Sequence, residues 1–329
     1  MTLTTHDAPL VAIVGPTAVG KTALAVRLAD EFPAEVVSAD SRQVYRYMDI
    51  GTAKPTAAER QRVQQHLLDV VDPDEPFTLA QYQALANVAI ADIQARGRLP
   101  LLVGGTGLYV HAVLEGLDIP HVEPHPLLRQ ELYAEADAQG CEALHRRLVA
   151  VDPAAAERID PRNVRRVVRA LEVCQQTGRP ISTLQRATPP PYRTLRIGLT
   201  MPRPLLYQRI DQRVEDMVAA GLVEEVRLLV RRGYGMELPS MSGVGYRQIG
   251  LYLRGEVSLD EAIALIKRQT RRFVRQQANW FRRDDPAIAW FETSEPVDGS
   301  IVAHIRCFLS QGPEVVHKGS GALEGRECR

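Results

Sequence analysis

Short apolar runs alternate with longer stretches of helical periodicity over the first third of the chain. Each run has the length of a buried strand, and each longer stretch places apolar side chains three or four positions apart, which is the spacing of one helix face. The predicted strands cover residues 10–14, 35–40 and 99–103, and the predicted helices cover residues 21–30 and 78–96. This alternation is typical of an α/β fold with a parallel sheet flanked by helices, and such sheets bind ligands at the carboxyl ends of their strands.

The pattern changes at about residue 117. Between residues 117 and 191 there is no strand pattern, and repeated prolines break the chain into helical segments, which predicts an all-helical insertion domain. An apolar run at 195–199 returns to the sheet, helices are predicted at 203–232, 258–283 and 298–309, and residues 236–253 are predicted as loop and short helix. We therefore expect a core from residues 1–116 and 192–310, an insertion from residues 117–191, and a disordered polar tail from residues 311–329.

The turn after the first predicted strand carries the pattern G-x-x-x-x-G-K-[ST]. It consists of Gly15, Pro16, Thr17, Ala18, Val19, Gly20, Lys21 and Thr22. The glycines let successive backbone N–H groups turn toward an anion, and the N-terminus of the following helix adds its partial positive charge. In this pattern the lysine reaches a terminal phosphate and the threonine hydroxyl is offered to Mg²⁺. The motif predicts a bound diphosphate or triphosphate in a P-loop NTPase-like sheet, but it does not specify a nucleotide.

Composition narrows the class of protein. The chain has 329 residues with 40 basic and 40 acidic side chains, so its net charge is zero. No apolar run approaches the ~20 residues of a membrane span, and the polar residues 1–9 contain no signal-peptide core. The cysteines are scattered, without the C-x-x-C spacing of a zinc site, at Cys141, Cys174, Cys307 and Cys328. We therefore expect a cytoplasmic protein with no membrane partner, and nothing in the sequence demands more than a monomer.

Arginine is concentrated in two stretches of this neutral chain. Residues 158–196 hold nine arginines against two acidic residues, and residues 264–283 hold seven basic residues and no acidic one. Such stretches are typical of a surface that contacts a phosphate backbone, although a solvated helix face has the same composition. On the predicted helix 258–283, the arginines share one face, and the other face is expected to pack against the core through Ile263, Ile266, Phe273, Gln277, Trp280 and Phe281.

Asp40 is the candidate for proton transfer. It ends the second predicted strand, so we expect it at the carboxyl edge of the sheet near the phosphate loop. A carboxylate there can take a proton from a nucleophile or bind a metal, and its simpler role would be to cap the following helix. Weaker signals come from the glycine-containing residues 51–55, 104–109 and 244–248. Lysine occurs only at positions 21, 54, 267 and 318, which singles out Lys54 in the first of these loops.

Together and in this order, the motifs resemble the tRNA dimethylallyltransferase family, the bacterial tRNA isopentenyltransferases. The matching segments are residues 15–22, 40–45, 51–55, 66–69, 104–109, 169–173 and 244–248. The similarity extends from residue 10 to about residue 290, and only the phosphate loop is specific by itself. The resemblance implies that the helical insertion binds tRNA.

The resemblance also implies a prenyl transfer. The phosphate loop would hold the diphosphate of dimethylallyl diphosphate, with Mg²⁺ near Thr22 and with Arg213, which matches the family's diphosphate-binding arginine. The acceptor would be the exocyclic amine of the adenine 3′ of the anticodon, position 37, in tRNAs that read codons starting with U. Asp40 would be the general base on that amine, and Thr106 would place the adenine. Lys21, the loop amides and Mg²⁺ would neutralise the leaving diphosphate.

The same matching implies a contact surface for the tRNA anticodon stem-loop. The implied residues are Asp40, Ser41, Arg42, Gln43, Thr106, Arg129, Arg165, Arg166, Arg169, Ser242, Gly243, Val244, Gly245, Tyr246, Arg247, Arg275, Gln276, Asn279 and Arg282. The match at Arg129 requires a shift of one residue. The chain departs from the family pattern at Gln65-His66, where two adjacent histidines are common, so this pair is given no role. The zinc-finger extension of the eukaryotic members is not seen, which favours a bacterial type.

Two other functions fit part of the sequence. A small-molecule kinase would use the phosphate loop for ATP and Asp40 as a base toward a hydroxyl, but it leaves the arginine stretches and the insertion unexplained. A non-catalytic RNA-binding module would use the loop only as an anchor, and it predicts that Asp40→Ala leaves function intact. A GTPase is disfavoured because the guanine-specific N-K-x-D pattern is absent.

Overall fold

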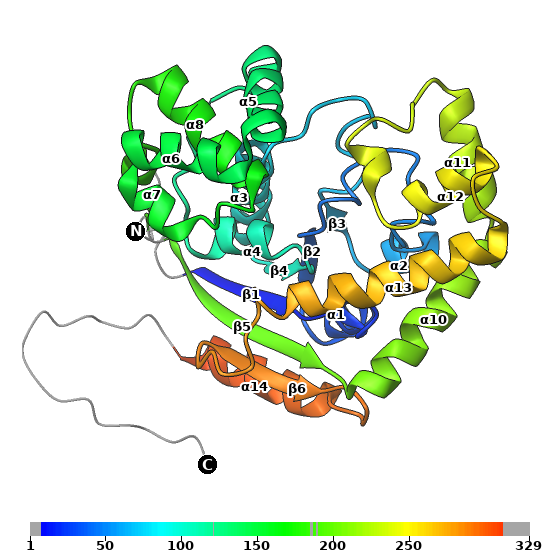
Figure 1. Ribbon diagram of the computed structural model, residues 1–329. Coiled ribbons are helices and arrows are strands. Elements are labelled where there is room, and N and C mark those ends of the chain that lie inside the picture. Colours follow the sequence, from blue (N-terminus) through cyan, green and yellow to red (C-terminus); the bar gives the residue numbers. More distant parts are fainter. Residues whose placement is uncertain (1–7, 121, 185–186, 189, 312–329) are drawn as a thin grey trace, which may run out of the picture.

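A parallel sheet of six strands forms the centre of the described chain (Figure 1). The structure, a computed structural model, describes residues 8–120, 122–184, 187–188 and 190–311, so the predicted tail lies outside the described residues apart from Gln311. Across the sheet the strands are β3 (Gln65–His66), β2 (Ala34–Ser38), β4 (Leu99–Val103), β1 (Ala8–Val14), β5 (Tyr192–Thr200) and β6 (Ile288–Glu292). Each neighbouring pair is parallel, so the carboxyl ends share one edge and the predicted fold class is confirmed.

Helices cover both faces of this sheet. On one face lie α1 (Lys21–Glu31), α14 (Asp298–Ser310) and the first turns of α10 (Arg203–Ala219), and on the other lie α3 (Leu79–Ala95) and α4 (Gly107–Leu114). A hydrophobic core lies on each face of the sheet, and alternate residues of β1 point into one or the other. Val11 and Ile13 pack on the α1 side, whereas Leu10 and Ala12 pack on the α3 side. This period of two explains why β1 reads as a continuous apolar run.

The insertion is a separate bundle of short helices. It contains α5 (Pro126–Gln139), α6 (Cys141–Val151), α7 (Pro153–Arg158), α8 (Val164–Thr177) and α9 (Ile181–Leu184). Pro126 and Pro153 stand in the first turns of α5 and α7, where no N–H donor is needed, so these prolines start helices. The buried side chains of Leu132, Leu144 and Leu171 form a core of their own.

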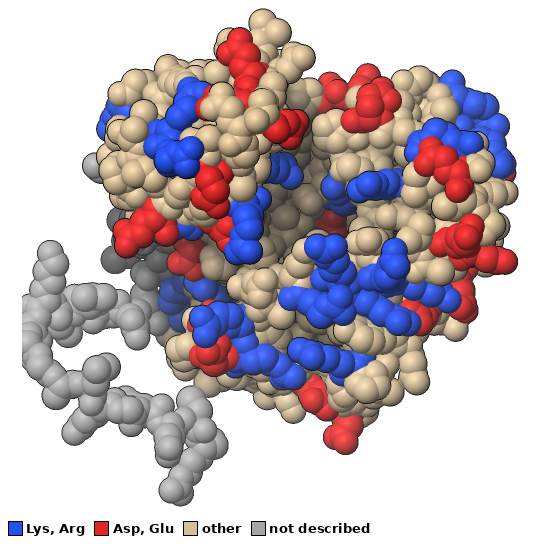
Figure 2. All heavy atoms as spheres, in the orientation of Figure 1, with Lys and Arg blue, Asp and Glu red and all other residues tan. Residues whose placement is uncertain are grey.

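A second helical lobe follows β5. It consists of the outer part of α10, α11 (Leu222–Arg231), the 3₁₀ turn η1 (Ser240–Ser242), α12 (Tyr246–Leu253) and α13 (Leu259–Gln277). Val44 and Met48, which follow β2, are fully buried in the core of this lobe, while the short helix α2 (Ala57–Arg62) packs against α1. Figure 1 places β2, β3 and β4 between the insertion and this lobe, and Figure 2 shows that the surface is hollowed between them.

The structure corrects several predicted elements. The single helix predicted over 203–232 is two helices, because Gly221 adopts a left-handed conformation with φ of 102° between them. The helix predicted over 258–283 ends at Gln277, and the following residues form turns. Phe273 was expected on the core face but is 41% exposed. The strands β3 and β6 and the helix α2 were not predicted.

Candidate active site

The loop between β1 and α1 has the conformation of an anion-binding turn. Gly15 has φ of 141°, and a Cβ there would lie 2.4 Å from the carbonyl oxygen of Leu199, so only glycine fits. Gly20 also has a positive φ, of 105°, at the start of α1. The N–H groups of Ala18, Gly20, Lys21 and Thr22 donate to no acceptor within the described residues. These converging donors are the groups with which a helix N-terminus binds phosphate.

Two cations lie beside this loop. The Nζ of Lys21 donates to the carbonyl oxygens of Gly15, at 3.0 Å, and Pro16, at 2.8 Å. Burial lowers the pKa of Lys21 to about 8, the charge of Asp40 opposes this shift, and the charge of Arg213 on α10 adds to it. Burial likewise lowers the pKa of Arg213, whose guanidinium has no hydrogen bond or ion pair with any described residue. Two partly desolvated cations with one nearby carboxylate favour a bound polyanion.

Asp40 and Thr106 lie in the turns that follow β2 and β4, and hydrogen bonds join these two turns. The Ser41 N–H donates to Thr106 Oγ1 at 3.0 Å, and the Thr106 N–H donates to the Ala39 carbonyl at 3.2 Å. A Cβ on Gly104 would lie 2.1 Å from that carbonyl oxygen, so the close approach requires glycine. The Arg42 N–H donates to Asp40 Oδ1 at 2.8 Å, while Oδ2 accepts no hydrogen bond from a described residue. One carboxylate oxygen therefore remains available to a substrate.

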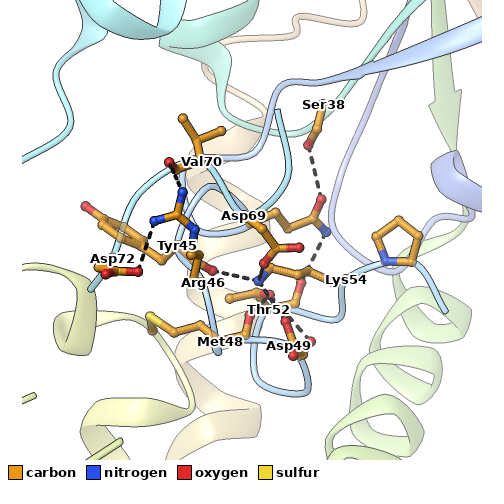
Figure 3. A network of polar contacts seen from close by, with 12 residues as sticks. Ser38, Tyr45, Arg46, Met48, Asp49, Thr52, Lys54, Asp69, Val70 and Asp72 are labelled. Atoms are coloured by element: carbon orange, nitrogen blue, oxygen red, sulfur yellow. Dashed lines mark hydrogen bonds and ion pairs between the residues drawn. The ribbon is translucent and has the colours of Figure 1, made fainter. Parts of the chain in front are cut away.

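Lys54 organises the loop that follows Asp40 (Figure 3). Its side chain is 1% exposed, and its Nζ donates to the Tyr45 carbonyl at 2.6 Å, to Asp49 at 2.7 Å and to Asp69 at 2.5 Å. The Gln43 amide joins the same region by contacting Ser38 Oγ at 3.1 Å and the carbonyls of Thr52 and Ala53. Lys54 thus holds the backbone of residues 43–54 in place and, unlike Lys21, is not part of the phosphate loop.

The Gln65-His66 pair has a structural contact on β3. His66 Nε2 lies 2.7 Å from Glu35 Oε2, and Glu35 also pairs with Arg96 and Arg98. Hydrogen bonds from Arg96, with a further contribution from His66, hold the pKa of Glu35 at about 2 against the opposing effect of burial. Because Glu35 lies near the start of β2, this cluster is separated from Asp40 by the length of the strand.

The arginines of the insertion fall into two groups. Arg165 and Arg166 are exposed on α8. Arg129 on α5 and Arg169 on α8 instead share the buried carboxylate of Glu172 on α8, at 2.8 Å and 2.6 Å, so Arg129 fastens α5 to α8. The first pair can meet a phosphate backbone directly, whereas the second pair is already partly neutralised.

The segment 242–247 also contains both exposed residues and buried residues. Ser242, Val244 and Arg247 are exposed. Arg42 contacts this segment by donating to Ser242 Oγ and to the carbonyls of Pro239 and Ser240. Gly243 and Gly245 are buried, and so is Tyr246, which is 1% exposed and donates from its hydroxyl to Glu225 at 2.6 Å. The expected contact of the Tyr246 side chain with tRNA is not open in this conformation, because the ring is part of the lobe's core.

The arginine side chains of α13 gather beside the hollow, as Figure 2 shows for this face of the molecule. Arg275 and Gln276 are exposed in the last turn of α13, and Asn279 and Arg282 are exposed in the turns that follow it. Arg282 pairs with Asp284 at 2.7 Å. The structure therefore keeps these four residues at the surface, although they do not all lie on one helix.

Sequence reasoning missed a buried aromatic pair near Asp40. The rings of Tyr82 and Tyr109 are stacked with centroids 3.7 Å apart, and the Tyr82 hydroxyl donates to the Ser38 carbonyl at 3.1 Å. Burial raises the pKa of both hydroxyls, and the charge of Asp40 adds to this effect. The helical periodicity of α3 placed Tyr82 in the core, but no sequence signal paired it with Tyr109.

Over the described residues, no helix is long and apolar enough to cross a membrane.

A parallel sheet with a phosphate loop after its first strand and a carboxylate after the next defines a P-loop-type, phosphate-binding α/β enzyme. Residues 43–284 match the family model described as IPP transferase, and residues 8–73 match the model described as isopentenyl transferase. The chain belongs to this family, which is that of the tRNA dimethylallyltransferases, so the predicted resemblance is confirmed.

Similar proteins agree over nearly the whole length. A tRNA dimethylallyltransferase of Roseiflexus sp. (strain RS-1) is 60% identical over 84% of this chain and 90% of its own, and that of Dehalococcoides mccartyi is 50% identical over 93% and 94%. The full-length tRNA isopentenylpyrophosphate transferase of Bacillus halodurans is 45% identical with a TM-score of 0.68 over 92% of this chain and 96% of that one. A eukaryotic dimethylallyltransferase solved acting on tRNA has a TM-score of 0.78 at 25% identity, over 95% and 82%.

Proposed function

We propose that this chain transfers the dimethylallyl group from dimethylallyl diphosphate to the exocyclic amine of adenine 37 of tRNA, 3′ of the anticodon, in tRNAs that read codons starting with U. Diphosphate is the leaving group. The observation that carries the proposal is the position of Asp40. Its charge acts on both Lys21 and Arg213, and its chain neighbours Ala39 and Ser41 are hydrogen-bonded to Thr106. One carboxylate thus lies between groups suited to the diphosphate and groups suited to the adenine.

The donor side neutralises a leaving group that gains charge. As the allylic C–O bond breaks, negative charge grows on the diphosphate oxygen. The loop offers unpaired N–H groups to this charge, and the cations Lys21 and Arg213 beside it are already desolvated, so they need little reorganisation during the reaction. The same cations would bind the substrate diphosphate before the reaction.

A magnesium ion fits the donor set at this position. Mg²⁺ prefers oxygen ligands, and it is often held by one protein oxygen together with substrate phosphates. The hydroxyl of Thr22, at the start of α1, has no hydrogen-bond partner among the described residues, and those residues contain no cluster of three His, Cys, Asp or Glu that would hold a metal by itself. Thr22 would therefore hold the ion, which supplies positive charge to the diphosphate when bound.

The acceptor side activates a weak nucleophile. The exocyclic amine of adenine shares its lone pair with the ring, so removal of its proton as the N–C bond forms lowers the barrier. Asp40 Oδ2 would accept that proton, and the Thr106 hydroxyl would help to place the base. The proton then resides on Asp40, and the prenyl carbon has exchanged its bond to oxygen for a bond to nitrogen.

The anticodon stem-loop would occupy the hollow between the two helical lobes. Basic side chains of α13 gather beside this hollow, and the exposed Arg275 on α13 and Arg165 and Arg166 on α8 are available to contact the RNA backbone. A base in a stacked loop must swing out to reach a recessed carboxylate, as other enzymes that modify nucleobases require. The two lobes would hold the backbone while adenine 37 enters.

A transfer assay with two alternative labelled donors distinguishes this function from a kinase and from a non-catalytic RNA-binding module. Unmodified bacterial tRNA and Mg²⁺ are incubated with the protein and either labelled dimethylallyl diphosphate or γ-labelled ATP. Label in tRNA from the first donor alone is the expected result. Release of phosphate from ATP without prenyl transfer would instead support a kinase or NTPase, and tRNA binding without either reaction would support a binding module.

A further inference from the structure

Gln277, the last residue of α13, connects the two halves of the active site. Its side chain is buried, at 3% exposure. Its Oε1 accepts the Thr17 N–H of the phosphate loop at 2.9 Å, and its Nε2 donates to the Gly105 carbonyl, next to Thr106, at 2.9 Å. A single amide thus spans from the loop suited to the diphosphate to the turn suited to the adenine.

The chemistry of this position selects an amide. One partner is an N–H donor and the other is a carbonyl acceptor, so the side chain must accept on one side and donate on the other. A carboxylate of the same shape accepts only and would face the Gly105 carbonyl with a second negative atom. A thioether of the same length satisfies neither partner.

The end of α13 that carries Gln277 also borders the protein surface and the start of α4. Arg275 and Gln276 precede it and are exposed. Trp280 follows it and packs on Gly107, where a Cβ would lie 2.1 Å from Trp280 Cγ. The end of α13 is therefore in contact with both halves of the site and open to an RNA on its outer side.

We propose that Gln277 is a positioning residue that sets the separation between the phosphate loop and the Gly105-Thr106 turn. In-line transfer requires the allylic carbon, its leaving oxygen and the adenine amine to be aligned, and a misplacement of about 1 Å can cost about 100-fold in rate. The inference rests on the proposed prenyl transfer. It assigns to Gln277 a part in the alignment of two bound substrates and none in the affinity for tRNA.

The primary test compares Gln277→Met with Gln83→Met in the full chain. Gln83 is a matched control because its amide also makes two hydrogen bonds to backbone groups, which it donates to the carbonyls of Ala112 and Leu117, away from the phosphate loop. With both substrates saturating, we expect the single-turnover rate of Gln277→Met to fall about 10- to 100-fold. The Kd for tRNA is expected to stay within about 3-fold of wild type, and Gln83→Met is expected to keep the wild-type rate within the same factor.

A second variant approaches the same contact from the opposite side. A Cβ at Gly105 would lie 2.3 Å from Gln277 Nε2 and 3.5 Å or more from the other nearest atoms, so Gly105→Ala displaces the amide alone. We expect Gly105→Ala to slow transfer in the wild-type background but to change the rate less than about 2-fold in a Gln277→Ala background. This cycle remains informative if Gln277→Met does not fold.

The isosteric change Gln277→Glu supplies a readout that a purely structural role would not move. Protonation of the introduced carboxyl restores a donor toward Gly105, so the rate relative to wild type should rise as the pH falls. The inference is overturned if Gln277→Met transfers at the wild-type rate, if Gln83→Met loses as much, or if the Gly105 and Gln277 effects are additive. Wild-type protein that transfers no prenyl group would contradict the proposed function itself.

Discussion

The backbone N–H of Ser41 donates a hydrogen bond of 3.0 Å to the side-chain hydroxyl of Thr106. This contact ties the turn after β2 to the turn after β4, and it lies next to Asp40 in the chain. The position of the Asp40 carboxylate therefore depends on a side chain that comes from a neighbouring strand.

Removing this hydrogen bond should lower turnover without weakening the donor. Thr106→Val keeps the shape but leaves the Ser41 N–H unpaired, which costs about 1–1.5 kcal/mol and corresponds to about a 10-fold loss in kcat. The KM for dimethylallyl diphosphate should stay unchanged, because the phosphate loop is intact. Thr106→Ser keeps the hydroxyl and should retain turnover within about 3-fold. Equal losses in the two variants would assign Thr106 to packing.

Affinity for the donor should depend on pH through Lys21. Its pKa of about 8 in the free protein lies below the ordinary value of 10.5, and a bound diphosphate favours the charged form and raises the pKa again. Above about pH 8 the free protein loses this proton and binding must take it up, so Kd should rise, by up to about 10-fold per pH unit. Calorimetry between pH 7 and 10 measures this slope. Lys21→Met should bind more weakly at pH 7 and lack the added slope, and a flat wild-type profile would exclude Lys21 from the diphosphate site.

The tRNA surface on α13 predicts a change in salt dependence. Arg275→Ala should weaken tRNA binding and reduce the slope of log K against log salt by about 1, because one phosphate contact is lost. Arg306→Ala is the control, since Arg306 is an exposed arginine on α14 that pairs with Glu31. Filter binding across a salt series gives both slopes. An unchanged slope for Arg275→Ala would assign that side chain to protein packing.

Glu35 predicts a stability effect that is separate from activity. Its folded pKa of about 2 is below the ordinary 4.5, so its contribution to stability is present above pH 4.5 and is lost as the pH falls from 4.5 toward 2. Glu35→Gln leaves the Arg96 and His66 contacts incomplete and should cost about 2 kcal/mol at pH 7. Chemical denaturation at pH 7 and pH 3 measures the difference, which should shrink at the lower pH. Prenyl transfer by the folded variant should remain at the wild-type rate.

The part of the fold that the sequence predicts correctly rests on local patterns. The strands β1, β2 and β4 are short apolar runs, and the phosphate loop is a contiguous motif of eight residues, so neighbouring positions are sufficient to recognise them. The two-residue strand β3 exists only through its pairing with β2, and no propensity rule finds it. The strand β6 pairs with β5 from about 90 residues away, in a stretch between two predicted helices for which no element was predicted.

Sequence motifs predicted the residues of the candidate site, but they did not predict the contacts between these residues. Asp40, Thr106 and Arg213 come from three distant segments. The structure joins the Asp40 turn to Thr106 through Ser41, and it places Arg213 where the charge of Asp40 acts on it. The sharing of Glu172 by Arg129 and Arg169 is invisible in a count of charges, because one partner lies 43 residues away. Helical periodicity put Gln277 on the buried face, but it could not distinguish a packed side chain from one that makes two specific hydrogen bonds.

The most direct test of the account is the single-turnover rate of Asp40→Asn with saturating tRNA and dimethylallyl diphosphate. The substitution keeps the shape and removes the base, so the rate should fall about 10²- to 10⁴-fold. The affinities for both substrates should stay close to those of wild type. Asp216→Asn, which changes an exposed carboxylate on α10, is the matched control and should transfer normally. A transfer rate near that of wild type in Asp40→Asn would contradict the assignment of Asp40 as the general base and with it the mechanism proposed for this site.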